Sequence, residues 1–437
     1  MIGTNIQRRA KSVPLLSGLI LTVLVSAGVL LAATPVHADT TFTVNSSADR
    51  EDQAPGDGKC FTGEILVIGD QCTLRAAIQE ANAFPGTDTI DFDIPTTGVA
   101  TISPGSGLPL ITRRVTIDGY TQGAATPNSI PPTQAGTNTV LKVRLVGSNA
   151  GLGLGDSASN SVVRGLAIDG CVADSCRTGI TLLGGTGYKI QGNFIGVEPD
   201  GTSHLGNIWG VILRGGTQGS TIGGASPAAR NLISANIFEG VLALDRSSGN
   251  TIQGNLIGLD KDGNPLGNGG AGVGLIFAGN GNRILSNSVS SNGGLGIDLS
   301  STNAADGVTA NDPKDPDTGP NRLQNYPLIT SAITFGPNTV VKGTLNSTPS
   351  TKLTKRSFIV QFFGSPSEDP SRFGEGKAFL GQTQVSTDGQ GNASFSFAPP
   401  RKVSEGQFVT ATATERATGD TSEFSRAKVV EPPVVQP

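Results

Sequence analysis

The sequence predicts an all-β protein whose core is a right-handed parallel β-helix. Three observations support this fold class: a seven-residue motif recurs at a fixed distance, short apolar strands alternate with Gly and Asn, and only one segment has the periodicity of an α-helix. Gly accounts for 61 of the 437 residues, about twice the ordinary usage, which suits many tight turns between short strands.

Residues 1–38 are predicted to be a signal peptide. A basic segment around Arg8 precedes an uncharged apolar stretch from 15 to 33, and residues 36–38 fit the small-residue cleavage pattern. Cleavage would make Asp39 the first residue of the mature chain. The alternative is an uncleaved membrane anchor, because the apolar stretch is nearly long enough to span a bilayer. We expect a secreted, extracellular or cell-surface protein with no membrane insertion after cleavage.

Export makes disulfides the expected role of the four cysteines. Pairing of nearest neighbours gives Cys60–Cys72 and Cys171–Cys176, which is one of three possible connectivities. Zinc is not expected, because no paired C-x-x-C occurs and His204 is the only histidine of the mature chain.

Residues 39–95 are predicted to form an N-terminal cap. Strands are expected at 41–44 and 88–92. Between them, residues 74–83 have apolar positions at helical spacing, and Thr73 can cap the helix N-terminus. An amphipathic helix beside the first coil would cover an exposed sheet edge, which a long solenoid needs.

This cap resembles the CSLREA domain, because it contains the run Cys72-Thr73-Leu74-Arg75-Ala76-Ala77. In this chain Thr73 and Ala76 stand where that domain usually has Ser and Glu. The flanking features are also similar: an earlier Cys60 in a Gly-rich loop, the I-Q-E-A-N-A run at 78–83 and the P-G-x-D-x-I run at 85–90. The resemblance implies a secreted or surface bacterial protein in which the cap precedes β-helix repeats. It assigns no catalytic residues.

Residues 96–327 are predicted to hold the β-helix repeats. Ile190–Gly196 recurs as Ile252–Gly258, 62 residues later (252 − 190 = 62), and the pattern appears twice in each unit, so the elementary period is about 30 residues. Such a period indicates coils that bury their apolar faces only against their neighbours. No helical pattern lies between the strands, which excludes a doubly wound α/β fold. A β-propeller is the rival, but its repeats are longer, about 40–50 residues.

Four asparagines of the repeats, Asn193, Asn236, Asn255 and Asn287, are expected at turns. Asn tolerates left-handed backbone geometry there, and its side chain can bond its neighbours.

Residues 328–430 are predicted to form a β-sandwich of five to seven strands, because the strands lengthen, the period vanishes and Phe becomes frequent. Residues 384–387 and 392–397 are expected to form a hairpin around Asp388. The segment is similar to a module that often follows such repeats in bacterial surface proteins. Residues 431–437 are expected to be a disordered tail.

Many right-handed β-helices are pectinases, so an enzymatic function is the main alternative: a polysaccharide lyase or a glycoside hydrolase acting on pectin or other uronate-type polymers. Such chemistry needs at least a pair of carboxylates or a positioned base. Asp169, Asp245 and Asp298 lie near predicted strands, but in no repeated register. We therefore expect no catalytic site.

Calcium is the single cofactor for which the sequence offers ligands. Asp260, Asp262 and Asn264 resemble the start of an oxygen-ligand calcium loop, and Glu198 and Asp200 occupy the equivalent loop 62 residues earlier. Both loops should emerge on the same side of the coils. The full motif is absent, because Ala271 stands where it requires Glu. Plain turns, which Asp and Gly favour, are the preferred interpretation.

A sugar-binding surface would need aromatic side chains, and the repeats contain Trp209, Tyr188, Phe194, Phe238 and Phe277. Most of them sit at alternating positions and are expected in the core. Trp209, directly before Gly210, is the candidate ligand contact, with a core position as its alternative.

The net charge of −4 and the 15% of charged residues do not indicate nucleic-acid binding. We expect a monomeric, non-catalytic structural or binding protein of adhesin or matrix type, with an extracellular polysaccharide or another surface protein as its partner.

Overall fold

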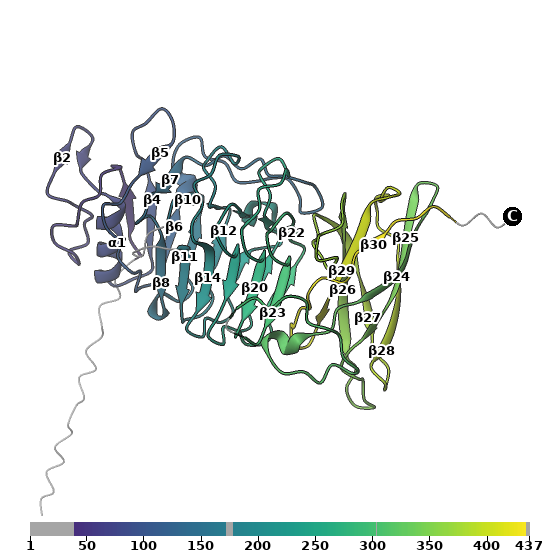
Figure 1. The fold of residues 1–437 in the computed structure, drawn as a ribbon. Helices are drawn as coiled ribbons and strands as arrows, with labels where there is room; N and C mark the ends of the chain where they lie inside the picture. The colour runs from purple at the N-terminus through teal and green to yellow at the C-terminus, as the bar shows by residue number, and fades with distance from the viewer. Residues whose placement is uncertain (1–38, 172–177, 303, 434–437) are drawn as a thin grey trace, which may run out of the picture. The chain divides into compact units, whose positions relative to one another are not determined.

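The computed structural model describes residues 39–171, 178–302 and 304–433. The signal peptide predicted for residues 1–38 lies outside this range. Within it the chain is mostly β, with three large parallel sheets, two antiparallel sheets, a short hairpin and one α-helix, as Figure 1 shows.

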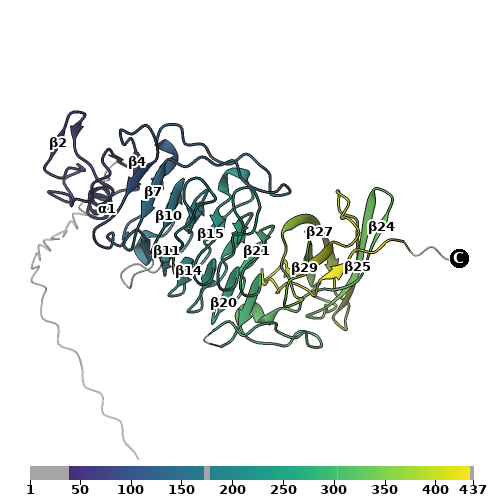
Figure 2. The ribbon, with the colours of Figure 1, turned by 45° about the horizontal axis from the view of Figure 1, so that its top comes forward.

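The three parallel sheets hold the strands of the predicted repeats, and neighbouring strands of each sheet lie side by side in Figure 2. Sheet 1 contains β1 (Thr41–Val44), β4 (Asp88–Phe92), β6 (Val115–Asp118), β9 (Val162–Arg164), β12 (Lys189–Gln191), β15 (Thr221–Gly223), β18 (Thr251–Gln253) and β21 (Arg283–Leu285). Sheet 2 contains β5 (Ala100–Ile102), β7 (Val143–Val146), β10 (Leu166–Asp169), β13 (Phe194–Ile195), β16 (Leu232–Ile233), β19 (Leu256–Ile257) and β22 (Ser288–Val289). Sheet 3 contains β8 (Leu152–Gly155), β11 (Thr178–Leu183), β14 (Trp209–Arg214), β17 (Val241–Ala243), β20 (Val273–Ile276) and β23 (Ile297–Ser300).

From β7 onward the chain visits sheets 2, 3 and 1 in a fixed rotation, and each rotation makes one coil. The motif strands β12 and β18 both lie in sheet 1, on either side of β15. The 62-residue repeat therefore spans two coils, as the period of about 30 residues predicted.

The buried face of sheet 1 shows why the repeat keeps its apolar positions. In the paired strands one aliphatic side chain of each coil lies directly above that of the next, and the stack is almost fully buried. Its members are Ile117, Val163, Ile190, Ile222, Ile252 and Ile284. Because side chains alternate between the two faces of a strand, a slip of one residue would expose the whole stack.

The corners between the sheets are held by ladders of buried asparagines. In the first ladder, Asn193, Asn231, Asn255 and Asn287, the backbone N–H and the Nδ2 of each Asn donate to the Oδ1 of the next. A second ladder runs through Asn207, Asn236, Asn268 and Asn292, and a third through Asn250, Asn282 and Asn321. The ladders satisfy backbone groups that a buried corner would otherwise leave unpaired.

The expected bonding of these asparagines to their neighbours is confirmed, but the expected left-handed backbone is wrong. Positive φ values fall not on these asparagines but on the residue before each of them: Gly192 at 66°, Ala235 at 60°, Gly254 at 71° and Ser286 at 54°. Gly takes this conformation at no steric cost at two of the corners, whereas Ala235 and Ser286 take it at the other two, and the asparagine side chains form the ladders.

The N-terminal segment carries the predicted helix, α1 (Leu74–Ala83), whose N-cap is Thr73. The Thr73 side chain accepts from the backbone N–H of Ala76 at 3.1 Å. A hairpin of β2 (Ile65–Leu66) and β3 (Gly69–Asp70) precedes α1. Strands β1 and β4 pair in parallel with each other and then with β6, so parallel pairing already begins within the segment predicted as a cap.

The C-terminal part has seven strands in two antiparallel sheets that share one hydrophobic cluster. One sheet contains β24 (Leu328–Phe335), β25 (Asn338–Asn346) and β28 (Asn392–Phe397), and the other β26 (Ser357–Ser365), β27 (Ala378–Ser386), β29 (Phe408–Glu415) and β30 (Lys428–Val429). The predicted hairpin is wrong: β28 pairs with β25 and not with β27. Phe395 and Phe397 of β28 instead pack on Phe362 of the other sheet. Pairing continues to Glu431, which bridges to Ile333.

Residues of this C-terminal part accept the N–H groups at the last coil. Ile284 N donates to Thr421 Oγ1 at 3.1 Å, and Leu299 N donates to Glu423 Oε1 at 3.0 Å. Val289 pairs with Gly376 in an antiparallel bridge. The second asparagine ladder also ends here, because both the backbone N–H and the Nδ2 of Asn292 donate to Glu375. These acceptors stand where the next coil would have stood.

Candidate functional site

The two loops predicted as calcium ligands do emerge side by side, because Lys261 N donates to Gly201 O at 3.0 Å. Their carboxylates, however, already have partners. Asp260 accepts from Asp262 N and from both the backbone N–H and the Nδ2 of Asn264.

The other predicted ligands are engaged as well. Asp262 pairs with Lys261, and Glu198 pairs with Arg144 at 2.8 Å. Burial acts to raise the pKa of Asp200, but hydrogen bonds from Ser203 and Thr202 outweigh it and lower that pKa. The geometry is that of two turns whose carboxylates cap their own backbone.

A disulfide joins Cys60 and Cys72, as predicted, with the two Cα atoms 5.2 Å apart. Cys171 is also disulfide-bonded. Cys176, its predicted partner, lies outside the described residues.

The three candidate catalytic aspartates are not brought together. Asp169 ends β10 in sheet 2, fully buried in an ion pair with Arg144 at 2.7 Å. Asp245 follows β17 in sheet 3 and pairs with Arg214. Asp298 lies on β23, two strands along the same sheet. No two of them form the close carboxylate pair that glycoside hydrolysis requires.

Asp298 has the most perturbed environment of the three. It is 1% exposed, its Oδ1 has no hydrogen-bond partner, and burial raises its pKa to about 6. Asp306 and Glu239 add to this rise. Nearby Glu423 is also buried, which raises its pKa to about 8 although Leu299 and Thr309 donate to it. These buried acids lie at the last coil, beneath residues 304–309.

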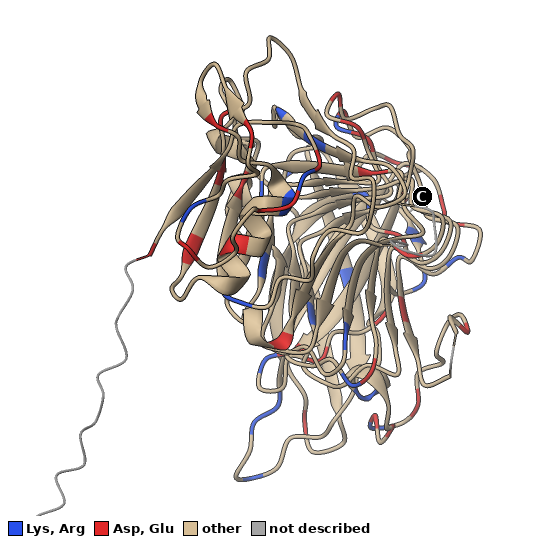
Figure 3. Cartoon of the chain, turned by 90° about the vertical axis from the view of Figure 1, so that its left-hand side faces the viewer, with Lys and Arg blue, Asp and Glu red and all other residues tan. Residues whose placement is uncertain are grey.

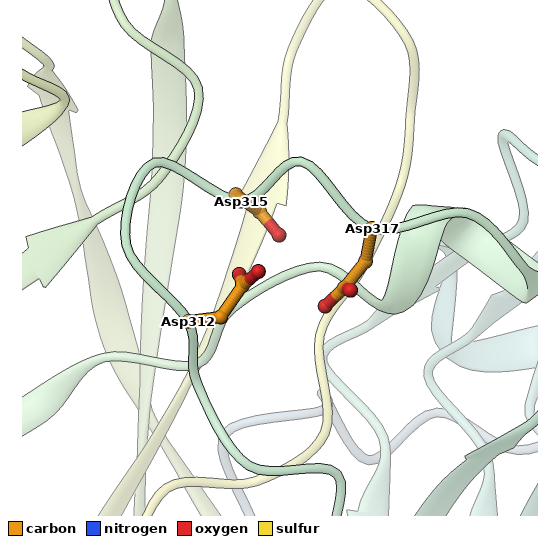
Figure 4. Close-up of side chains that lie close together, drawn as sticks. All are labelled: Asp312, Asp315 and Asp317. Carbon is orange, nitrogen blue, oxygen red and sulfur yellow. The ribbon is translucent and has the colours of Figure 1, made fainter.

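A group of three carboxylates that the sequence did not single out lies in the loop before β24. Within the parts of the chain that the structure describes, Asp312, Asp315 and Asp317 alone bring three potential metal-ligand oxygens within 4.8 Å of one another, and Figure 4 shows their side chains converging. Asp315 accepts from Gln324, Asn325 and Ser347, and its pKa rises to about 6 through burial. The Asp-Pro-Lys-Asp-Pro-Asp run was the available signal, but spacing alone does not distinguish such a cluster from a polar loop.

The aromatic side chains divide between the core and the surface. Tyr188 and Phe194 are fully buried, as expected. The core positions expected for Phe238 and Phe277 are wrong, because these rings are 46% and 47% exposed.

Trp209 lies outside the main core, at the start of β14. It packs on the outer face of sheet 3 beside Ile212, Leu242 and Ile276. Its ring stacks on that of Phe238 from the next coil, with centroids 5.4 Å apart and the planes inclined by 29°. Trp209 Nε1 donates to Glu239 Oε2 at 3.0 Å, which fixes the orientation of the indole.

We call Trp209 and Phe238, with the Glu239 carboxylate at their edge, the aromatic platform. The corner residues of the two following coils are Gly269-Gly270 and Gly293-Gly294, so no side chain rises beside Phe238 on that side. Gly270 N donates directly to Phe238 O at 3.0 Å. When the coils are aligned on their ladder asparagines, Ile237-Phe238 stands at the position that is Gly-Gly in the two following coils. This difference between coils is the feature of the sequence that could have indicated the platform.

Charges of both signs are interspersed along the coils, as Figure 3 shows. Among the residues described, which exclude the first 38, no helix is both long and apolar enough to cross a membrane. The chain matches no family model and no curated protein.

Proposed function

We propose that this protein is a secreted or cell-surface binding protein, of adhesin or matrix type and without catalytic activity, that holds an extracellular polysaccharide on the aromatic platform. The stacked and partly exposed pair Trp209–Phe238 carries this proposal. Aromatic faces suit sugar rings because they offer a large, rigid apolar surface beside polar groups.

The scaffold of the proposal is a right-handed parallel β-helix. The rotation of the chain through sheets 2, 3 and 1 supports closure of each coil around the shared core. Connections between parallel strands of one sheet are right-handed in nearly all proteins, which supports that hand. Such a scaffold holds side chains of successive coils about 4.8 Å apart, so it can display a rigid binding strip.

The predicted signal peptide and the resemblance of the N-terminal segment to the CSLREA domain support an extracellular location. The disulfide Cys60–Cys72 agrees with an oxidising compartment. We propose that the mature protein acts as a monomer, without membrane insertion and without nucleic acid as a partner.

The enzymatic alternative, a lyase or hydrolase of uronate-type polymers, receives less support. Asp169 and Asp245 are engaged in ion pairs, and Asp298 is shielded from solvent. A substrate could reach Asp298 only if residues 304–309 moved away.

The proposal is tested by affinity gel electrophoresis of the mature protein against a panel of neutral and acidic polysaccharides. Trp209→Ala and Phe238→Ala should each weaken the observed binding about tenfold, which corresponds to about 1.4 kcal/mol. Phe335→Ala is the matched control, because Phe335 is also an exposed aromatic ring (52%) but lies in the C-terminal part.

Binding that is equally strong in the Trp209 and Phe335 variants would contradict the platform. Release of reducing or unsaturated sugar ends by the wild type, lost in Asp298→Asn, would contradict the absence of catalysis.

A further inference from the structure

A second surface feature lies away from the aromatic platform, in a cavity of about 360 Å³. Its walls come from three places: the loop Pro132–Gly136, residues of sheet 2 and its following loop such as Leu256 and Leu259, and the C-terminal strands around β26 and β27. This volume falls within the range of small-ligand pockets, about 300–1,000 Å³.

The charge of the cavity is one-sided. Lys377, Arg401 and Lys402 line it, and no Asp or Glu is among its lining residues. None of the three cations forms an ion pair with a carboxylate in the described part of the chain. Three uncompensated cations around one cavity are notable in a chain whose net charge is −4.

A further cation lies behind the wall of the cavity. Arg230 is 2% exposed, and its guanidinium donates to backbone oxygens of Gly136 at 2.5 Å and of Gly254 at 3.2 Å. Burial without a carboxylate lowers its pKa to about 10, still far above neutral pH. Arg230 therefore both anchors the loop that forms one wall and adds positive potential to the cavity.

The remaining lining residues supply the other contacts that a sugar needs. Leu256, Leu259 and Leu380 give an apolar floor, and the hydroxyl or amide groups of Ser365 and Gln407 can bond to hydroxyls. Arg401 can bind a carboxylate through two parallel N–H groups, which a lysine cannot.

We infer that this cavity binds a carboxylate-bearing sugar of one or two rings, at a site separate from the aromatic platform. Lys377, Arg401 and Lys402 would neutralise the carboxylate, while the apolar floor would pack against the ring. Lys377 also borders a neighbouring pocket that contains Glu368 and Asp369, so Arg401 and Lys402 are the better residues to test.

The test is isothermal titration calorimetry of the mature protein with three acidic disaccharides, those of galacturonate, glucuronate and mannuronate, and with neutral digalactose. At least one acidic disaccharide should bind, digalactose should bind at least tenfold more weakly, and added salt should weaken the acidic ligand because it screens exposed charges. The double variant Arg401→Ala/Lys402→Ala should bind the acidic sugar at least tenfold more weakly.

The control double variant, Lys352→Ala/Lys355→Ala, removes two exposed cations of the C-terminal part that do not line the cavity, and it should bind as the wild type does. Failure of all three acidic disaccharides to bind, or equal loss in the two double variants, would overturn the inference. Sulfate that binds as tightly as the acidic sugar would also overturn it. Trp209→Ala separates the two sites, because it should leave the acidic disaccharide unaffected.

Discussion

Removal of one asparagine from the middle of a corner ladder should be among the most destabilising single changes in this protein. The side chain of Asn255 makes four buried hydrogen bonds: its Oδ1 accepts from Asn231 N and Nδ2, and its Nδ2 donates to Ile222 O and Asn287 Oδ1. Asn255→Ala removes all four of these bonds at a position that is 1% exposed, although Asn231 Nδ2 keeps its bond to Ile190 O and Asn287 Oδ1 keeps its bond from the backbone N–H of residue 255. At about 1 kcal/mol for each hydrogen bond, the free energy of unfolding should fall by about 4 kcal/mol.

Two further variants make the magnitude testable by urea unfolding, followed by both circular dichroism and Trp209 fluorescence. Asn287 ends the same ladder and makes three side-chain hydrogen bonds, so Asn287→Ala should cost about 3 kcal/mol. Asn338 is exposed at the start of β25, and its substitution by Ala should change the stability by less than about 0.5 kcal/mol. A loss below about 1 kcal/mol for Asn255→Ala would refute the view that these ladders stabilise the corners.

Three other outcomes are expected. The pKa of Glu423 is raised from 4.5 to about 8, so the stability that its protonation contributes is complete below pH 4.5 and is lost as the pH rises through 8. The free energy of unfolding should therefore fall by on the order of 2 kcal/mol between pH 6 and 9. The Glu423→Gln variant should show a flatter dependence on pH. Replacement of Cys60 and Cys72 by Ser removes a link across 12 residues and should lower stability by about 2–4 kcal/mol, measured by urea unfolding; an unchanged midpoint would contradict this. In thermal melts, Asp260→Asn should respond to calcium and to EDTA as the wild type does, because the Asp260 carboxylate already accepts hydrogen bonds within its own turn. If calcium shifted the melting temperature of the wild type but not of this variant, the calcium-site interpretation would be favoured again.

The parts of the fold that were predictable are those in which local pattern and tertiary packing agree. The near-identity of the motifs at 190–196 and 252–258, which differ only at Phe194 and Leu256, reflects stacked positions in sheets 1 and 2, so the period could be read directly. The helix α1 follows from its apolar spacing and its Thr73 cap. In these segments each residue's local preference matches its final environment.

The predictions that were wrong concern which strands or side chains, distant in the sequence, come into contact. Asp388 makes a tight turn, but whether β28 then pairs with β27 or crosses to β25 depends on where Phe395 and Phe397 find a core. The exposure of Phe238 likewise depends on which residues of neighbouring coils stand beside it. Alternation within one strand cannot predict either outcome, because it gives the side of the strand and not what covers that side.

The same asparagine repeats at successive corners also bear on how such a chain can change in length. The coils from Asn193 to Asn292 offer their neighbours nearly the same aliphatic stack and the same amide ladders. A tandem duplication of the 62-residue unit would add two coils, about 10 Å of height, without altering either terminal segment. Recombination between repeats can therefore set the distance between the two ends of the molecule independently of what each end binds.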